Sequence, residues 1–181
     1  MTRYIAFLRS INVGGHVVTM DYLFHLFEEM GFAAVETYIA SGNVIFESEA
    51  GDPRVLEQTI AARLREALGY EVATFIRTAA EVAEIARYEP FAAADLAAPC
   101  VSLYVGMAAQ ALGKDAQRTV LSFRTPVDDF HIQQRDIYWL CRIRSSDSAF
   151  SLARFEKATS MQATFRNATT MRKLAALYGG E

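Results

Sequence analysis

The order of the apolar segments restricts the possible folds of this chain more than its composition does. Residues 1–77 contain short apolar runs, typical of strands, and longer segments with an apolar residue every three or four positions, typical of helices. The predicted strands are residues 3–8, 35–39, 43–47 and 72–77, and the predicted helices are residues 19–30 and 52–68. The order strand, helix, strand, strand, helix, strand is that of a ferredoxin-like plait.

Local signals support these boundaries. Asp52 followed by Pro53 is typical of a helix N-terminus, and Gly69 is typical of the residue that ends a helix. The sequence TAAE at residues 78–81 is a capping box, which predicts a connecting helix to about Tyr88. An alanine-rich linker is then expected over residues 90–99.

After this linker the same order of elements is predicted again. The expected strands are residues 101–106, 127–132, 136–143 and 161–165, and the expected helices are residues 114–123, 148–158 and 170–178. We therefore expect an α+β protein of two tandem ferredoxin-like plaits packed together, with a C-terminal helix. The expected domains are a first plait over residues 1–77, a connecting helix and linker over 78–99, and a second plait-like half over 100–181. The repetition is one of element order and not of residues.

Charge and cysteine content narrow the class of protein. The net charge of −3 counts against a protein that binds nucleic acid through many phosphates. Cys100 and Cys141 lie far apart outside any CxxC spacing, which is typical of a reducing compartment, so we expect a cytoplasmic location without a signal peptide. Residues 96–113 are uncharged, but Pro99 and Gly106 favour loop, strand and loop over a membrane span.

The connection between the first strand and the first helix carries RSINVGGH at residues 9–16 and is longer than a turn requires. Gly14 and Gly15 can adopt positive φ, so that successive backbone N–H groups point into one concavity. Arg9 adds a cation, and the N-terminus of the following helix favours negative charge. These features suit an anion such as phosphate or carboxylate. A tight strand-to-helix connection, with Arg9 paired to a surface carboxylate, is the structural alternative.

Two further stretches are open to a functional or a structural interpretation. The sequence SGN at residues 41–43 is turn chemistry, and a functional role would require the hairpin tip to lie near another polar loop. In a plait we expect this hairpin and the loop after the first strand at opposite ends of the sheet if both are short, so that a shared pocket does not follow automatically. In TFRNATT, at residues 164–170, Asn167 or Thr169 caps the last helix, and Arg166 either faces an anion or lies at the surface.

The histidines give little indication of a metal site or of catalysis. Asp21, His25 and Glu29 share one helical face, which suits a metal but is more typical of a solvated charged surface. Asp129 and His131 alternate on one strand face, as a base and its orienting residue would, with no nucleophile beside them.

Taken together, YIAFLRSINVGG, TYIASGNVIF and TFRNATT resemble the bacterial family called domain of unknown function 1697, over nearly the whole chain. The family pattern has LRGINVGG and TRNW, so Ser10 stands in place of Gly and Ala168 in place of Trp. The resemblance implies a pair of ferredoxin-like plaits and no known activity. It also implies that the positions carrying the pattern form a site: Arg9, Asn12, Gly14, Gly15, Ser41, Asn43, Arg166 and Asn167.

Our main functional hypothesis is that residues 9–15, with help from Arg166 and Asn167, bind an anionic small molecule, for example one bearing a phosphate. His16 is expected to contact this ligand and is the nearby candidate for proton transfer; whether a reaction follows, and the oligomeric state, are left open. No cofactor, metal or membrane partner is expected. One alternative is a structural or assembly protein. The other is a nucleic-acid-binding module on the basic C-terminal third, which contains Arg142, Arg144, Arg154, Lys157, Arg166, Arg172 and Lys173.

Overall fold

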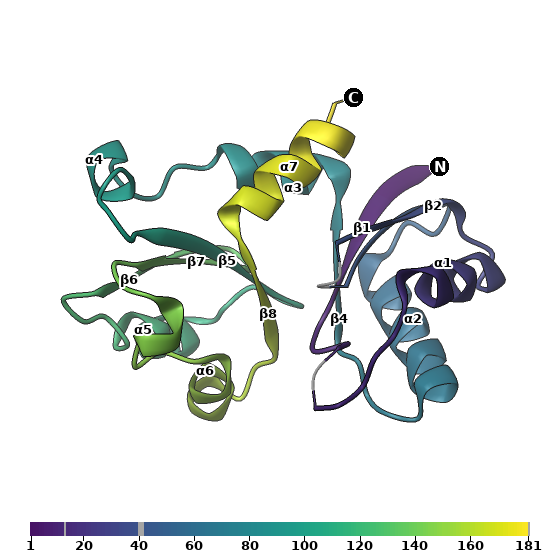
Figure 1. Cartoon of the computed structure of the whole chain (residues 1–181), viewed down its shortest axis with the longest axis horizontal. Coiled ribbons are helices and arrows are strands. Elements are labelled where there is room, and N and C mark those ends of the chain that lie inside the picture. Colours follow the sequence, from purple (N-terminus) through teal and green to yellow (C-terminus); the bar gives the residue numbers. More distant parts are fainter. Residues whose placement is uncertain (13, 40–41, 181) are drawn as a thin grey trace. The chain divides into compact units, whose positions relative to one another are not determined.

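A computed structural model describes residues 1–12, 14–39 and 42–180 of the chain. In these residues the fold is mixed α+β, with two four-stranded antiparallel sheets and seven α-helices (Figure 1). The chain divides into two compact units, Met1–Val82 and Ala83–Glu181. Each unit contains one of the sheets.

The first unit follows the order strand, helix, strand, strand, helix, strand. Its elements are β1 (Thr2–Leu8), α1 (Met20–Glu29), β2 (Ala33–Tyr38), β3 (Asn43–Ser48), α2 (Pro53–Leu68) and β4 (Thr74–Thr78). The strands lie in the order β2-β3-β1-β4, so β1 pairs antiparallel with both β3 and β4. Helices α1 and α2 lie on the same side of this sheet (Figure 1). Between them and the sheet is an apolar core that includes Leu23, Phe27, Phe46, Ile60 and Leu64.

The local signals in the sequence form the helix ends that they predict. The hydroxyl of Thr19 accepts a hydrogen bond from the backbone N–H of Tyr22 at the start of α1. The carboxylate of Asp52 accepts one from Arg54 N at the start of α2, and Gly69 ends α2 in the left-handed conformation that glycine adopts without strain. The TAAE capping box opens α3 (Ala79–Arg87), with reciprocal bonds between the side chains of Thr78 and Glu81 and each other's backbone N–H.

The second unit repeats the order after a short helix. Its elements are α4 (Ala93–Leu96), β5 (Ser102–Ala108), α5 (Lys114–Leu121), β6 (Asp128–Gln133), β7 (Asp136–Cys141), a 3-10 turn (Ser145–Asp147), α6 (Leu152–Thr159), β8 (Ala163–Asn167) and α7 (Ala168–Tyr178). The strand order β6-β7-β5-β8 matches that of the first sheet. The core over one face of the sheet is rich in aromatic rings, among them Phe130, Trp139, Phe150 and Phe155.

Strand registers give a residue-by-residue correspondence between the two sheets. Tyr4 lies opposite Phe46 and stacks on it with ring centroids 5.7 Å apart, and Tyr104 lies opposite Trp139 at 4.9 Å in the same stacked geometry. Each central strand also pairs with a second neighbour. In the first unit this neighbour is β4, where the buried Arg77 lies opposite Ile5. In the second unit Val105 lies opposite Arg166, which is also buried.

Two expected segments differ from the structure. The expected linker at residues 90–99 contains the exposed or partly exposed turn of helix α4, built from alanines that favour helix locally. The helix expected over residues 148–158 begins at Leu152, because the hydroxyl of Ser151 caps it by accepting from Arg154 N. Phe150, before the helix, packs in the core against Phe130 and Trp139.

The uncharged stretch at residues 96–113 is not one continuous element. It contains the end of α4, strand β5 and the loop that precedes α5. No helix in the described part of the chain is both long enough and apolar enough to cross a membrane.

Candidate functional site

Three connections meet at one end of the first sheet. The register pairs Phe7 with Asn43, and the backbone N–H of Leu8 donates to the carbonyl of Gly42 at 2.8 Å, which puts the β2–β3 turn beside the end of β1. The backbone N–H of Arg9 donates to the carbonyl of Ala73 at 2.9 Å, which adds the α2–β4 connection. The expectation that the hairpin and the loop after β1 lie at opposite ends is therefore wrong. Helix α1 makes β1 and β2 run in the same direction, so both strands end at the same edge.

The connection from β1 to α1, residues 9–19, is here called the opening loop. It is held to the rest of the unit at both ends. Ile11 and Val18 are buried in the first core. The side-chain oxygen of Asn12 accepts a hydrogen bond from Val18 N at 2.7 Å, which closes the segment between them. The hydroxyl of Tyr70, in the α2–β4 connection, donates to the carbonyl of Ile11 at 2.9 Å.

Gly14 and Gly15 lie in this closed segment and are exposed. Their φ angles are +69° and +86°, a region in which other residues are strained. A Cβ added at either position would meet nothing within 4 Å. The glycines are therefore required for the backbone conformation and not for close packing, and the loop surface around them is open to a ligand.

His16 follows the glycines and is exposed. Its imidazole stacks on the ring of Tyr70, with centroids 3.9 Å apart and an interplanar angle of 23°. Burial raises the pKa of Tyr70 above its ordinary value, so its hydroxyl stays a donor at neutral pH. Sequence reasoning missed Tyr70. The available signal was an aromatic residue directly after the helix-ending Gly69, in a connection that reaches this end of the sheet.

Arg9 is half-buried at the first position of the opening loop, and its Nε is shielded from solvent. A guanidinium held in this way loses less side-chain entropy on binding an anion than a fully mobile one.

The second unit shows how short this connection can be. There β5 ends at Ala108 and α5 begins at Lys114, so that residues 109–113 make the same strand-to-helix connection in five residues. The opening loop uses eleven. The strand and helix do not require the additional length, which in the first unit contains the two glycines and His16.

The turn between β2 and β3 supports the opening loop. Gly42 has a φ of +78°, and a Cβ there would come 2.8 Å from Cγ2 of Ile11, so the glycine allows the turn to approach the loop closely. Asn43 is fully buried, and its amide donates to the carbonyl of Tyr38 at 2.9 Å. Ser41 lies outside the described residues, so its place in the expected site stays a prediction.

Arg166 and Asn167 belong to the second unit. Nη1 of Arg166 donates to Thr164 Oγ1 at 2.9 Å and to the Phe165 carbonyl at 3.0 Å. Burial lowers the pKa of Arg166 to about 10, which leaves it charged at neutral pH. The side chain of Asn167 accepts from Thr169 N at 2.8 Å and is the N-cap of α7, as one of the two predictions for this cap had it.

The remaining histidines have local partners. His25 lies 3.3 Å from Glu28 and 3.7 Å from Asp21, whereas Glu29 pairs with Arg63. His131 contacts the hydroxyl of Tyr88 through Nε2 at 2.8 Å. Asp129 bonds instead to Arg124, so the structure does not bring Asp129 and His131 together as a base and its orienting residue. No cluster of metal-binding side chains is found among the described residues.

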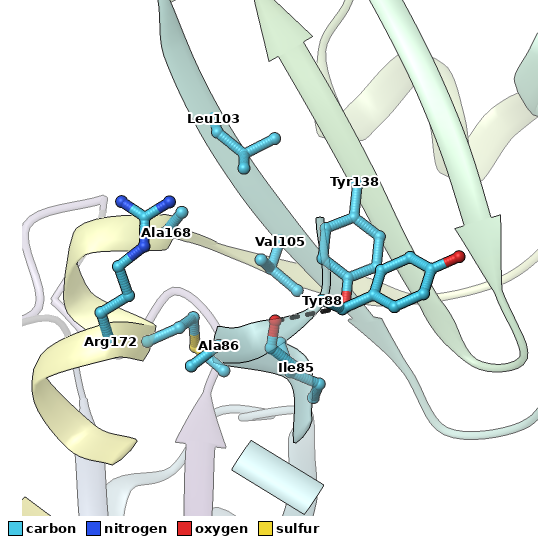
Figure 2. A pocket seen from close by; sticks show the side chains of 9 residues that line it. Ile85, Ala86, Tyr88, Leu103, Val105, Tyr138, Ala168 and Arg172 are labelled. Atoms are coloured by element: carbon cyan, nitrogen blue, oxygen red, sulfur yellow. Dashed lines mark hydrogen bonds between the residues drawn. The ribbon is translucent and has the colours of Figure 1, made fainter. Parts of the chain in front are cut away.

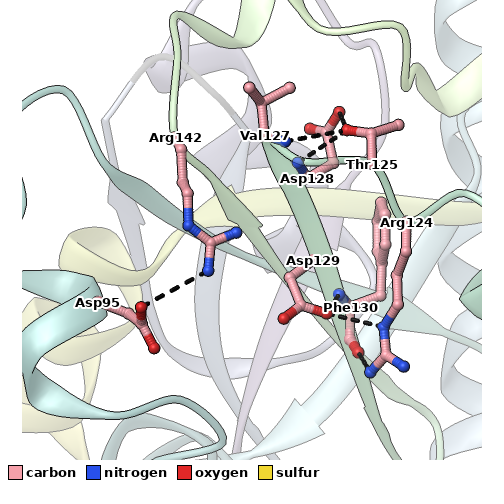
Figure 3. A network of polar contacts seen from close by, with 8 residues as sticks. All are labelled: Asp95, Arg124, Thr125, Val127, Asp128, Asp129, Phe130 and Arg142. Atoms are coloured by element: carbon pink, nitrogen blue, oxygen red, sulfur yellow. Dashed lines mark hydrogen bonds and ion pairs between the residues drawn. The ribbon is translucent and has the colours of Figure 1, made fainter.

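Asp128 belongs to a polar network in the second unit, and Figure 3 shows its contact with Thr125. Asp128 is buried, and its carboxylate accepts hydrogen bonds from Trp139 Nε1 at 2.9 Å, Ser148 Oγ at 2.8 Å and Thr125 Oγ1 at 3.0 Å. These bonds join β6 and β7 to the segments that precede β6 and α6. The network joins these segments through the buried carboxylate of Asp128, and it therefore contributes to stability.

Several basic residues of the C-terminal third are engaged inside the second unit. Arg142 pairs with Asp95 at 3.7 Å (Figure 3), and Arg154 donates to the Ala149 carbonyl while its guanidinium lies over the ring of Phe123. Arg172 is exposed at the edge of a very small cleft between α3, α7 and the sheet (Figure 2). These residues come from separate elements and do not line a single described groove.

Comparison with known proteins identifies relatives of this architecture. The family model of a protein of unknown function, DUF1697, matches residues 1–138. The chain belongs to the DUF1697 family. The match contains the opening loop and the β2–β3 turn, whereas residues 164–170 lie beyond it.

A solved structure is similar over nearly its whole length. It is the conserved bacterial protein SP0830 from Streptococcus pneumoniae, with a TM-score of 0.71 and 19% sequence identity, and the similarity covers 99% of each chain. At this identity the likeness concerns the fold alone. No curated protein matches the chain.

Proposed function

We propose that this DUF1697 protein binds a small anionic molecule, of the phosphate class, at the opening loop. The observation that carries the proposal is the contrast in length between two connections of one chain. Five residues join β5 to α5, whereas the opening loop uses eleven and holds two exposed glycines at positive φ after Arg9. The two glycines let an anion approach the backbone without side chains in the way, and Arg9 supplies the charge.

The other predicted residues take different parts in this proposal. Asn12 positions the loop through its bond to Val18, and the buried Asn43 positions the neighbouring turn. Arg9, Gly14, Gly15 and His16 contact the ligand. The participation of Arg166 and Asn167 remains a prediction, as does proton transfer by His16.

The affinity expected from this site is modest. A hydrogen bond to a charged group contributes about 1.5–3 kcal/mol, and two such bonds correspond to a dissociation constant on the order of 1 mM. The measurement is a titration of the protein with inorganic phosphate, simple phosphate monoesters and carboxylates, followed by amide shifts in NMR. Binding should shift the amides of Gly14 and Gly15.

Two arginine variants separate binding from architecture. Arg9→Ala should weaken phosphate binding by roughly tenfold, the loss of one charge-assisted bond, with folding retained. Arg54→Ala removes an exposed arginine from α2 and should change neither binding nor fold. If no anion binds, or if Arg9→Ala lowers only the melting temperature, the opening loop is architectural and the structural alternative holds. Binding of short RNA that weakens steeply with salt would favour the nucleic-acid alternative instead.

We also propose that each unit is a ferredoxin-like plait and that the two arose by duplication. The shared strand order supports this proposal, as do the matched positions of Tyr4 with Tyr104 and of Arg77 with Arg166 in the registers. Under this proposal the opening loop is an elaboration that the first copy has and the second lacks. This difference is what a ligand site added to a pre-existing fold would produce.

A further inference from the structure

The stacked pair of His16 and Tyr70 is a rigid aromatic surface beside the two glycines. The Tyr70 ring is half-buried, and its hydroxyl is fixed by the bond to the Ile11 carbonyl. One face of the imidazole contacts Tyr70 at a centroid distance of 3.9 Å. Because His16 is nevertheless exposed, the outer face of its ring is open to solvent.

The fold itself does not account for this pair. The corresponding connection of the second unit, residues 109–113, contains no aromatic residue and joins its strand to its helix all the same. In the first unit the stack holds an imidazole outward directly after Gly15. A planar ring placed against its outer face would extend the stack, and aromatic side chains bind nucleic acid bases in this way without regard to sequence.

We infer that the ligand of the opening loop is a nucleotide. This inference rests on the proposed function, in which the amides of Gly14 and Gly15 and the guanidinium of Arg9 bind the phosphate. The base stacks on the outer face of His16, whose orientation Tyr70 fixes. His16 and Gly15 are adjacent in the chain, so one small molecule with a phosphate and a planar ring can reach both.

The test compares three probes that share parts of a nucleotide: adenosine 5′-monophosphate, ribose 5-phosphate and adenosine. Binding of each is measured by NMR titration in the same buffer. The variants are His16→Ala, which removes the ring, and His16→Phe, which keeps an aromatic ring. His25→Ala is the matched control, because His25 is exposed on α1 with its own acidic neighbours.

If the inference holds, the nucleotide binds at least about tenfold more tightly than ribose 5-phosphate, as expected for one stacked base. The imidazole signals of His16 move upfield with the nucleotide and not with ribose 5-phosphate. His16→Ala removes the tenfold difference between the nucleotide and ribose 5-phosphate, His16→Phe restores this difference, and His25→Ala has no effect.

Two other outcomes overturn the inference and are distinguishable. Equal binding of the nucleotide and ribose 5-phosphate, insensitive to His16→Ala, rejects the base-stacking role and leaves the phosphate site in place. Absence of binding by both phosphates rejects the proposed function as well.

Discussion

At the scale of single residues, Asp128 shows what a sequence pattern conceals. In the sequence it is one of two adjacent aspartates at the start of a predicted strand, and the alternation with His131 draws attention to Asp129 instead. In the structure Asp128 is buried with three hydrogen-bond donors around its carboxylate, whereas Asp129 is partly exposed and pairs with Arg124. The strand alternation puts neighbours on opposite faces, and only packing decides which face is the interior.

This difference gives a prediction for Asp128→Asn. The substitution replaces an acceptor oxygen by an N–H₂ group among donors from Trp139, Ser148 and Thr125, so at least one bond to a charged group is lost. We expect the free energy of unfolding to fall by about 2–3 kcal/mol in urea titrations. The matched variant Asp129→Asn should cost less than about 1 kcal/mol, because its ion pair is partly exposed. An equal loss of unfolding free energy in the two variants would contradict the distinct structural roles given to Asp128 and Asp129.

At the scale of secondary-structure elements, the sequence was informative where the interactions are local. The capping residues Thr19, Asp52 and Thr78 bond to backbone groups two or three positions away, so their roles follow from spacing alone. Helix α6 is the counter-example. Ser151 caps its start at Leu152, but Phe150, which the sequence pattern places inside the helix, lies before it and packs in an aromatic core whose other members are distant in the chain.

The N-cap of α7 separates a structural role from a binding role. Asn167→Ala removes the bond to Thr169 N and should lower the free energy of unfolding by about 1 kcal/mol. Thr169→Ala, an exposed substitution on the same turn, should change it by less than about 0.5 kcal/mol. Both unfolding curves and phosphate titrations are measured. A loss of phosphate binding in Asn167→Ala alone would place this residue in the ligand site, whereas unchanged binding would limit it to capping.

At the scale of the whole molecule, matching positions of the two sheets are occupied by different pairs of residues. Ala6 lies opposite Ile76 in the first sheet, and Gly106 lies opposite Phe165 at the matching place in the second. A Cβ on Gly106 would come within 2.5 Å of the Phe165 ring. The larger side chain on one strand is therefore compatible with only the smallest residue on the other.

These pairs predict that the residue pair of the first sheet can replace the pair at the matching place in the second sheet. Gly106→Ala alone should cost about 1–3 kcal/mol by overpacking, and Phe165→Ile alone should cost stability by underpacking. The double variant, which copies the pair of the first sheet, should cost at least about 1 kcal/mol less than the sum of the two in urea unfolding. Ala6→Gly is the control, since it relieves no contact and should cost about 0.5–1 kcal/mol. Additive costs would mean that the two positions are not equivalent.

The sequence by itself determined the identity and order of most strands and helices, because periodicity and capping act over a few residues. It also pointed to RSINVGGH as a connection longer than its strand and helix need. The tertiary structure alone decided how closely the β2–β3 turn approaches this loop, at Gly42 and Ile11, and that Tyr70 stacks on His16. It likewise decided that Asn43 is buried. Strand pairing and helix crossover bring together residues tens of positions apart, and no local pattern records which ends of the strands meet.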